Sequence, residues 1–210
     1  MIHGALDFSA ASAVFAVAKD GVKLFEVSKT MQRRDAAAFA QFLRDALNGY
    51  GLDFADITHW TVGSGPGSFT GMRIAASFVQ GLTYGKDVKS RTVCGAEAVA
   101  SGAGEKDKNA CVIYDGRNKE IILLDLASGK SAILNREQAE LYFKENSFAA
   151  FAAMEYDKKA IELIVPEFVF DKIKWAEKLD TEVFFNSENE FDDDLTKLIY
   201  IRPSVAGANE

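Results

Sequence analysis

Residues 57–82 read ITHWTVGSGPGSFTGMRIAASFVQGL, and the succession of residue types in this stretch decides the fold class. The run from Ile57 to Gly63 is short and apolar, as is typical of a buried strand. Gly63 to Gly67 contain three glycines and one proline, a composition that marks a turn. From Met72 to Leu82 apolar residues recur three and four positions apart, which predicts a helix. The stretch therefore predicts a strand, a glycine loop and a helix.

The residues before this stretch predict three strands and a helix. Apolar runs at 4–8, 12–18 and 22–28 have the length of strands, and Asp20-Gly21 between the last two is a hairpin signal. Helical spacing of apolar residues over 34–48 then predicts an amphipathic helix.

The residues after the stretch add a strand over 88–94 and a short helix over 95–101. The first hundred residues thus predict the order βββαβα. Three leading strands followed by alternating helices and strands are typical of a ribonuclease-H-like or actin-like lobe.

The rest of the chain predicts a second, smaller lobe. A loop of small and charged residues over 101–108 separates the two, and we place the lobes at 1–104 and 105–210. The second lobe opens with a pair of strands, and its later residues have a blurred pattern. We expect strands at 110–114 and 120–126 joined by a turn at 115–118, helices at 135–146 and 170–179, apolar runs of undecided type at 148–154 and 161–165, and an acidic surface stretch at 186–194.

The amino-acid composition argues against several classes of protein. A chain of 210 residues with 48% hydrophobic and 26% charged residues is typical of a globular protein, and only two cysteines, Cys94 and Cys111, argue against a disulfide framework. A formal charge of −7 argues against tight RNA binding by this chain alone. We see neither a signal peptide nor an apolar run of about 18 residues, and therefore predict a cytoplasmic protein without a membrane span.

The glycine loop lacks the lysine of a phosphate-binding P-loop, and its glycines do not match the GxGxxG of dinucleotide-binding folds. Amides at a helix N-terminus nevertheless favour an anion. The alternative is a tight turn that caps the helix. At the end of the first strand, Asp7 and Ser9 stand where actin-like ATPases place a metal-coordinating acid and a phosphate loop, with a hairpin turn as the alternative. The candidate residues of this degenerate nucleotide or anion loop are Asp7, Ser9, Gly65, Gly67, Ser68, Thr70 and Arg73.

No pattern of catalytic side chains stands out. The two histidines, His3 and His59, do not accompany a nucleophile motif, and neither GxSxG nor HExxH occurs. The acidic run Asp192 to Asp194 is more simply a solvated loop than a metal site. We therefore predict no catalytic and no metal-binding residue.

The glycine loop and the helix after it resemble the signature of a known family. Residues 63–82 resemble the GPGSFTGLRIG…GLA signature of the TsaB (YeaZ) family, and weaker matches follow in the same order at 6–9, 93–100, 115–120 and 200–203. Phe8 and Asp35 depart from that family's usual threonine and histidine.

The resemblance implies an α/β, actin-like (ASKHA, ribonuclease-H-like) fold of two related lobes. It also implies a non-catalytic partner, or scaffold, of the catalytic subunit TsaD and the ATPase TsaE. Together these proteins transfer threonylcarbamoyl to the tRNA adenosine next to the anticodon. ATP and metal are then expected in the partner subunits and not in this chain, with tRNA contacted only through the complex. The alternative is an actin-like ATPase or a glycoprotease-like hydrolase that acts alone.

By the same resemblance, the two helices of the first lobe form an interface with TsaD, or with a second copy when the chain is alone. Both helices are apolar on more than one side, which favours two packing partners. The alternative is that both pack only on their own sheet. The candidate interface residues are Ala36, Phe39, Ala40, Leu43, Leu47, Met72, Ala75, Ala76 and Val79.

Overall fold

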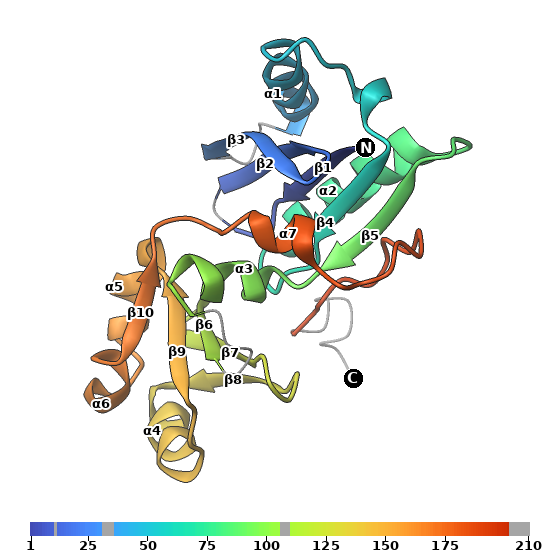
Figure 1. The fold of residues 1–210 in the computed structure, drawn as a ribbon. Coiled ribbons are helices and arrows are strands. Elements are labelled where there is room, and N and C mark those ends of the chain that lie inside the picture. Colours follow the sequence, from blue (N-terminus) through green and yellow to red (C-terminus); the bar gives the residue numbers. More distant parts are fainter. Residues whose placement is uncertain (11, 31–35, 106–109, 202–210) are drawn as a thin grey trace, which may run out of the picture. The chain divides into compact units, whose positions relative to one another are not determined.

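The computed structural model describes residues 1–10, 12–30, 36–105 and 110–201 (Figure 1). It divides into two compact units: unit 1 contains Met1–Gly95 and Thr181–Tyr200, and unit 2 contains Ala96–Asp180 and, among the described residues, Ile201. The division placed from sequence at 104/105 therefore differs in two respects. The helix that begins at Gly95 continues into unit 2, and the segment 181–200 belongs to unit 1, because its packing partners lie about a hundred residues earlier in the chain.

Unit 1 is built around a five-stranded sheet in the order β3-β2-β1-β4-β5. The first three strands are antiparallel neighbours, whereas β4 pairs parallel with both β1 and β5. This confirms the predicted lobe. Its elements are β1 (Ile2–Asp7), β2 (Ser12–Lys19), β3 (Val22–Thr30), α1 (Ala36–Asn48), η1 (Phe54–Asp56), β4 (His59–Gly63), α2 (Phe69–Thr83), β5 (Lys89–Val93) and α7 (Glu182–Asn186).

The hairpin between β2 and β3 forms where the sequence predicts it. Asp20 and Gly21 have φ angles of 51° and 81°, and two successive positive φ values are what a tight hairpin turn requires. β1 is the central strand and is buried on both faces.

The two faces of β1 meet different elements. Leu6 lies in a core cluster with Phe39 and Leu43 of α1 and with Val79 of α2, so both helices pack on the same face of the sheet. His3 is three positions away and therefore lies on the opposite face. There its ring contacts Phe185 of α7, with the ring centroids 5.1 Å apart.

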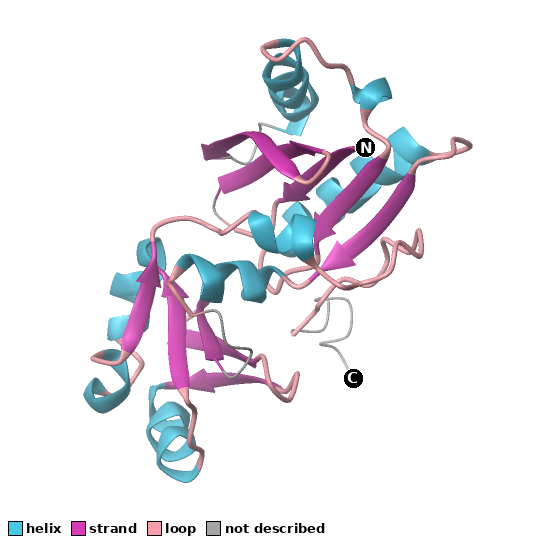
Figure 2. Ribbon diagram, in the orientation of Figure 1, coloured by secondary structure: helices cyan, strands magenta, loops and turns pink. Residues whose placement is uncertain are grey.

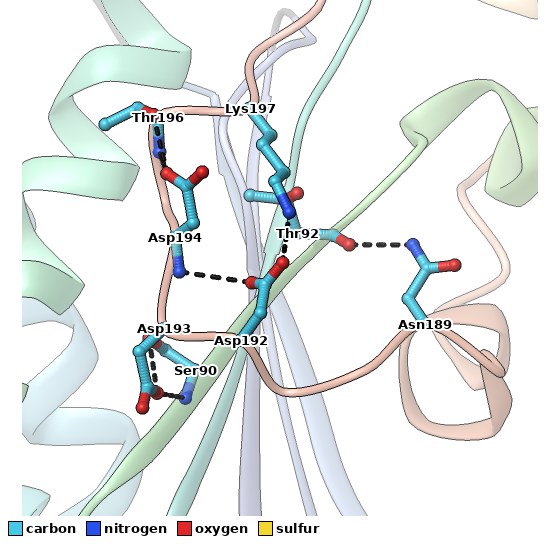
Figure 3. A network of polar contacts seen from close by, with 8 residues as sticks. All are labelled: Ser90, Thr92, Asn189, Asp192, Asp193, Asp194, Thr196 and Lys197. Atoms are coloured by element: carbon cyan, nitrogen blue, oxygen red, sulfur yellow. Dashed lines mark hydrogen bonds and ion pairs between the residues drawn. The ribbon is translucent and has the colours of Figure 1, made fainter.

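Residues 187–200, which we call the C-terminal strap, cover the outer edge of β5 (Figure 3). The backbone amide of Asp193 donates to the carbonyl of Ser90 (2.9 Å), and its carboxylate accepts from the Ser90 amide (2.6 Å). The side-chain amide of Asn189 donates to the carbonyl of Thr92 (2.9 Å). Leu195 of the strap is buried in the unit 1 core. The strap thus protects a strand edge that would otherwise expose unpaired backbone groups.

Unit 2 repeats the strand order of unit 1. Its sheet runs β10-β9-β6-β7-β8, with an antiparallel trio followed by two strands parallel to β6 (Figure 2). Its elements are α3 (Gly95–Gly102), β6 (Ala110–Arg117), β7 (Glu120–Asp125), β8 (Ser131–Asn135), α4 (Arg136–Glu145), β9 (Ala150–Met154), η2 (Glu155–Asp157), α5 (Lys158–Glu162), α6 (Glu167–Phe170) and β10 (Ile173–Ala176).

Three details of unit 2 differ from the sequence-based expectation. The helix predicted over 170–179 is wrong, because Ile173–Ala176 form strand β10 beside β9. Strand β8 was not predicted. The turn expected at 115–118 falls later, because β6 continues through a register shift between Asp115 and Arg117.

Candidate functional site

The glycine loop joins β4 to α2 and is held by backbone hydrogen bonds on several sides. The Ser64 amide donates to the carbonyl of Val93 (2.8 Å), and the Ile199 amide of the strap donates to the carbonyl of Ser64 (2.8 Å). The Gly95 amide donates to the carbonyl of Gly65 (2.8 Å). The end of β5, the start of α3 and the strap therefore position this loop.

The loop is also closed against the end of β1. Ser68 is the N-cap of α2: its hydroxyl accepts from the Gly71 amide (3.2 Å), and its own amide donates to the carbonyl of Ser9 (2.7 Å). A Cβ on Gly71 would lie 1.9 Å from the carbonyl oxygen of Phe8, and a Cβ on Gly67 would lie 2.2 Å from that of Ser9. Two carbonyl oxygens thus lie directly against the glycines that precede and begin α2.

Asp7 is the last residue of β1 and is completely buried. Its Oδ1 accepts two hydrogen bonds from Ser9, one from the amide (2.9 Å) and one from the hydroxyl (2.8 Å). Its Oδ2 is buried without a hydrogen-bond partner among the described residues. Burial raises the pKa of this carboxyl above its usual range, and the two hydrogen bonds from Ser9 act in the opposite direction.

Arg73 lies at the surface, in the first turns of α2. Its guanidinium lies over the ring of Phe69, 3.8 Å from the centroid, and its Nε donates to the hydroxyl of Tyr200 (3.2 Å). Thr70 is exposed. The structure therefore brings Asp7, Ser9, Gly65, Gly67 and Ser68 together, whereas Arg73 is engaged with two aromatic rings. Whether this loop binds an anion stays a prediction.

A second polar cluster, on the α7 face of the sheet, was not predicted from sequence. The Arg91 side chain of β5 is buried and donates to the backbone carbonyls of Phe184, Phe185, Ser187 and Asn189 at 2.7 to 3.2 Å. Its Nε donates to the hydroxyl of Thr61 (3.0 Å), which also bonds Nε2 of His3 (2.9 Å). The only signal in the sequence is a single arginine within the strand predicted over 88–94.

Protonation of His3 is strongly opposed. Burial, followed by the positive charges of Arg91 and His59, lowers the pKa of His3 to about 3. The ring is therefore neutral at physiological pH. With Arg91, it fastens α7 and the start of the strap to the sheet.

Neither a reactive thiol at Cys111 nor a metal site is seen among the described residues. Cys111 is buried, and burial raises the pKa of its thiol to about 12. Within the described parts of the chain, no three His, Cys, Asp or Glu side chains gather closely enough to hold a metal ion. Over the same residues, no helix is both long and apolar enough to cross a membrane.

Comparison with known proteins places this fold and loop in a family. A sequence model described as TsaD, tRNA N6-adenosine threonylcarbamoyltransferase, matches residues 27–169, which is more than half of the chain. The chain belongs to this family. The chain is also similar to curated TsaB proteins, described as tRNA threonylcarbamoyladenosine biosynthesis proteins, from Haemophilus influenzae (29% identity over 119 residues) and Escherichia coli (31% over 104 residues).

These matches cover 56% and 49% of this chain and 50% and 45% of the two relatives, so the chain spans about half the length of the curated proteins that it matches. The resemblance to the TsaB (YeaZ) family seen in the sequence is confirmed.

Solved structures support the fold. A crystal structure from Pseudomonas aeruginosa, described as an uncharacterized protein with similarity to peptidase YEAZ, superposes with a TM-score of 0.68 at 21% identity, over 96% of this chain and 99% of that one. A structure described as YeaZ from the same organism has a TM-score of 0.55 at 22% identity, over 72% and 84% of the two chains. The actin-like (ASKHA) fold class is therefore confirmed.

In the two candidate interface helices, most of the named residues face the interior of unit 1. Phe39, Leu43, Leu47, Met72, Ala75, Ala76 and Val79 are buried within unit 1. All of these except Met72 lie in one core cluster with strand residues such as Leu6, as the alternative weighed from sequence expects, whereas the Met72 side chain lies against Gly65 of the glycine loop. Ala40 is exposed, and the side chain of Ala36 lies outside the described residues. Whether the helices also bind a partner stays a prediction.

Proposed function

We propose that this protein is a non-catalytic partner subunit in the formation of threonylcarbamoyladenosine in tRNA. In this role it supports the transfer reaction of TsaD, together with TsaE, at the adenosine next to the anticodon. The family match and the names of the curated relatives support the pathway. The observation that carries the partner role is the closure of the glycine loop on the end of β1.

The closure of the loop disfavours phosphate binding, because a phosphate group is bound by backbone N–H groups that are free to donate to it. Here the Ser68 amide is bonded to the carbonyl of Ser9, and the Gly71 amide to the Ser68 hydroxyl. The carbonyl oxygens of Phe8 and Ser9 lie against Gly71 and Gly67, and they repel a phosphate. The arrangement supports a scaffold role, with ATP and metal held by the partner subunits and tRNA contacted through the complex.

The proposed partner surface is the outward side of α1 and α2. Because the inward residues form the core, the residues that remain for a partner are exposed ones such as Ala40 of α1 and Ser77 and Gly81 of α2. A Cβ on Gly81 meets no atom within 4 Å, so a larger side chain there does not disturb the chain's own packing. The same surface serves for a homodimer when TsaD is absent.

Size-exclusion chromatography with light scattering, on this chain alone and mixed with its cognate TsaD, tests the proposal together with a threonylcarbamoyl-transfer assay that contains TsaE. Ala40→Arg and Gly81→Arg are expected to lose the heterodimer and the transfer activity while remaining folded. A buried arginine without a partner is costly at an interface. Ala149→Arg, the same kind of change at an exposed position of unit 2, is the matched control and is expected to behave as wild type.

Two results would overturn the proposal. One is full transfer activity of TsaD and TsaE without this chain. The other is hydrolysis of ATP or peptide by this chain alone at a rate that loop variants abolish, which would favour a self-sufficient ATPase or hydrolase.

A further inference from the structure

The carboxyl of Asp7 has one oxygen that the protein surrounds and leaves without a hydrogen bond. The side chain is inaccessible to solvent, and its Oδ2 is buried without a partner among the described residues. Buried polar atoms are nearly always paired, so an unpaired carboxyl oxygen needs a physical explanation.

The space around Oδ2 exists because two neighbours have no side chain. A Cβ on Gly63, at the end of the adjacent strand β4, would lie 1.8 Å from Oδ2 and 2.6 Å from Cγ. A Cβ on Gly95 would lie 3.1 Å from Oδ2, 3.3 Å from the carbonyl oxygen of Gly65 and 3.5 Å from the hydroxyl of Ser9. Backbone from β4 and from the start of α3 therefore encloses this oxygen.

The actin-like fold implies a divalent cation and nucleotide phosphates near the end of the first strand, and the residues present here do not fit them. Mg²⁺ requires a carboxylate oxygen that is open to the ion and its waters. Oδ1 of Asp7 already accepts both hydrogen bonds from Ser9, and Oδ2 has no exposed surface. The carbonyl of Ser9, on the next turn of chain, is bonded to the Ser68 amide.

We infer that Asp7 is a neutral carboxylic acid, which holds a proton and not a metal ion where the ends of β1 and β4 pack against Gly95. An ionised carboxylate here would be buried without a counter-charge, which a protein avoids by keeping the group neutral. Burial and the two hydrogen bonds from Ser9 account for the shifted pKa of the Asp7 carboxyl, and no charged group contributes to it. The elements that pack against the carboxyl present Gly63, Gly65, Gly95 and Ser9, none of which carries a charge. This inference does not depend on the proposed function.

Carbon NMR of the full chain, with ¹³C in the aspartate carboxyl groups, tests the inference directly. Asp7→Asn identifies the Asp7 resonance by its disappearance. We expect the wild-type Asp7 signal to keep the position of a protonated acid at pH 6, where Asp20 is ionised because the N-terminal amino group lowers its pKa. Mn²⁺ should leave the Asp7 signal unbroadened. An Asp7 signal that titrates near the ordinary value of about 3.9, or that Mn²⁺ broadens selectively, would refute the neutral acid.

Thermal unfolding of wild type and Asp7→Asn across pH gives a second readout. The amide mimics the neutral acid but does not titrate. Since the folded wild type retains a proton that the unfolded chain releases above about pH 3.9, its melting temperature should fall relative to that of Asp7→Asn as the pH rises. The opposite slope, or a rise in the wild-type melting temperature with Mg²⁺ that Asp7→Asn lacks, would show that the carboxylate is the ionised, cation-binding form.

Discussion

Arg91 shows how one charged residue can be structural. Its guanidinium cannot be deprotonated at ordinary pH, yet it is buried in β5. Four backbone carbonyls from 184–189 receive its N–H groups, and the ring of Phe191 lies 4.2 Å from its central carbon. The carbonyls at the end of α7 are thereby satisfied, as the last carbonyls of a helix must be. Arg91 thus links the strap to the sheet.

Arg91→Met should destabilise unit 1 by about 3 kcal/mol or more, because several buried carbonyls lose a charged donor at once. Lys86→Met, at an exposed position shortly before the same strand, is the control and should change stability by less than about 0.5 kcal/mol. Urea denaturation of both variants measures the difference. Equal midpoints for the two would show that the strap does not depend on Arg91.

His3 should make the protein sensitive to acid. Its folded pKa of about 3 lies below that of the unfolded chain, so the unfolded state takes up the proton first as the pH falls. The stability that neutral His3 contributes is complete above about pH 6.5 and is lost on acidification toward pH 3, with a slope of up to about 1.4 kcal/mol per pH unit. His3→Asn should have a shallower slope over this range, measured by urea unfolding at several pH values. Identical slopes for wild type and His3→Asn would contradict the lowered pKa of His3.

At the scale of elements, the sequence predicts most of unit 1 and less of unit 2. Turns with strong local chemistry, such as Asp20-Gly21 and the glycine loop, are readable because few residue types tolerate those backbone angles. The segment that forms β10 was predicted as a helix because Phe170, Ile173 and Ala176 recur three positions apart. Only its pairing with β9, which local sequence does not encode, makes it a strand.

The sequence identifies residues of the candidate site, but it does not predict the contacts between them. Asp7, Ser9 and the loop residues were identified from sequence, since they follow neighbouring strands. Gly63 and Gly95 leave space for Oδ2 of Asp7 because a Cβ on either would lie close to that oxygen. The spacing of residues in the sequence does not predict this direction. The burial of Val79 and Met72 likewise depends on which side of α2 faces the sheet.

Two glycines of α2 should respond to alanine in opposite ways. Gly71→Ala places a Cβ 1.9 Å from the Phe8 carbonyl oxygen and should cost about 2 kcal/mol or more, as overpacking does. Gly81→Ala meets open space in the same helix and should add about 0.5–1 kcal/mol, because alanine loses less backbone entropy than glycine. Chemical denaturation compares the two. A destabilised Gly81→Ala would mean that this face of α2 is already occupied.

At the scale of the whole molecule, each unit has the same strand order, and unit 1 is assembled from two separate pieces of chain. The second piece contributes Leu195 to the core, covers the edge of β5 and supplies the carbonyls that Arg91 binds. Unit 1 is therefore incomplete without residues 181–200.

A chain that ends at Asp180 should lose the folding transition of unit 1 and retain that of unit 2. The two tryptophans report on the units separately, since Trp60 is buried in unit 1 and Trp175 lies in unit 2. Fluorescence-detected urea unfolding in Trp175→Phe and Trp60→Phe backgrounds, each compared with its full-length form, measures both transitions. A normal Trp60 transition in the shortened chain would show that the strap is dispensable.

The split of unit 1 has a consequence for biosynthesis. A ribosome delivers residues in order, and domains fold as units while the chain emerges. Residues 1–95 leave the ribosome first but must wait for 181–200, whereas the main part of unit 2, Ala96–Asp180, is one continuous stretch. Until then the β5 edge has no strap and Arg91 lacks the carbonyls that it will bind. The half of the protein that is translated first is therefore the half that finishes folding last, and it is the half that a nascent-chain chaperone would need to protect.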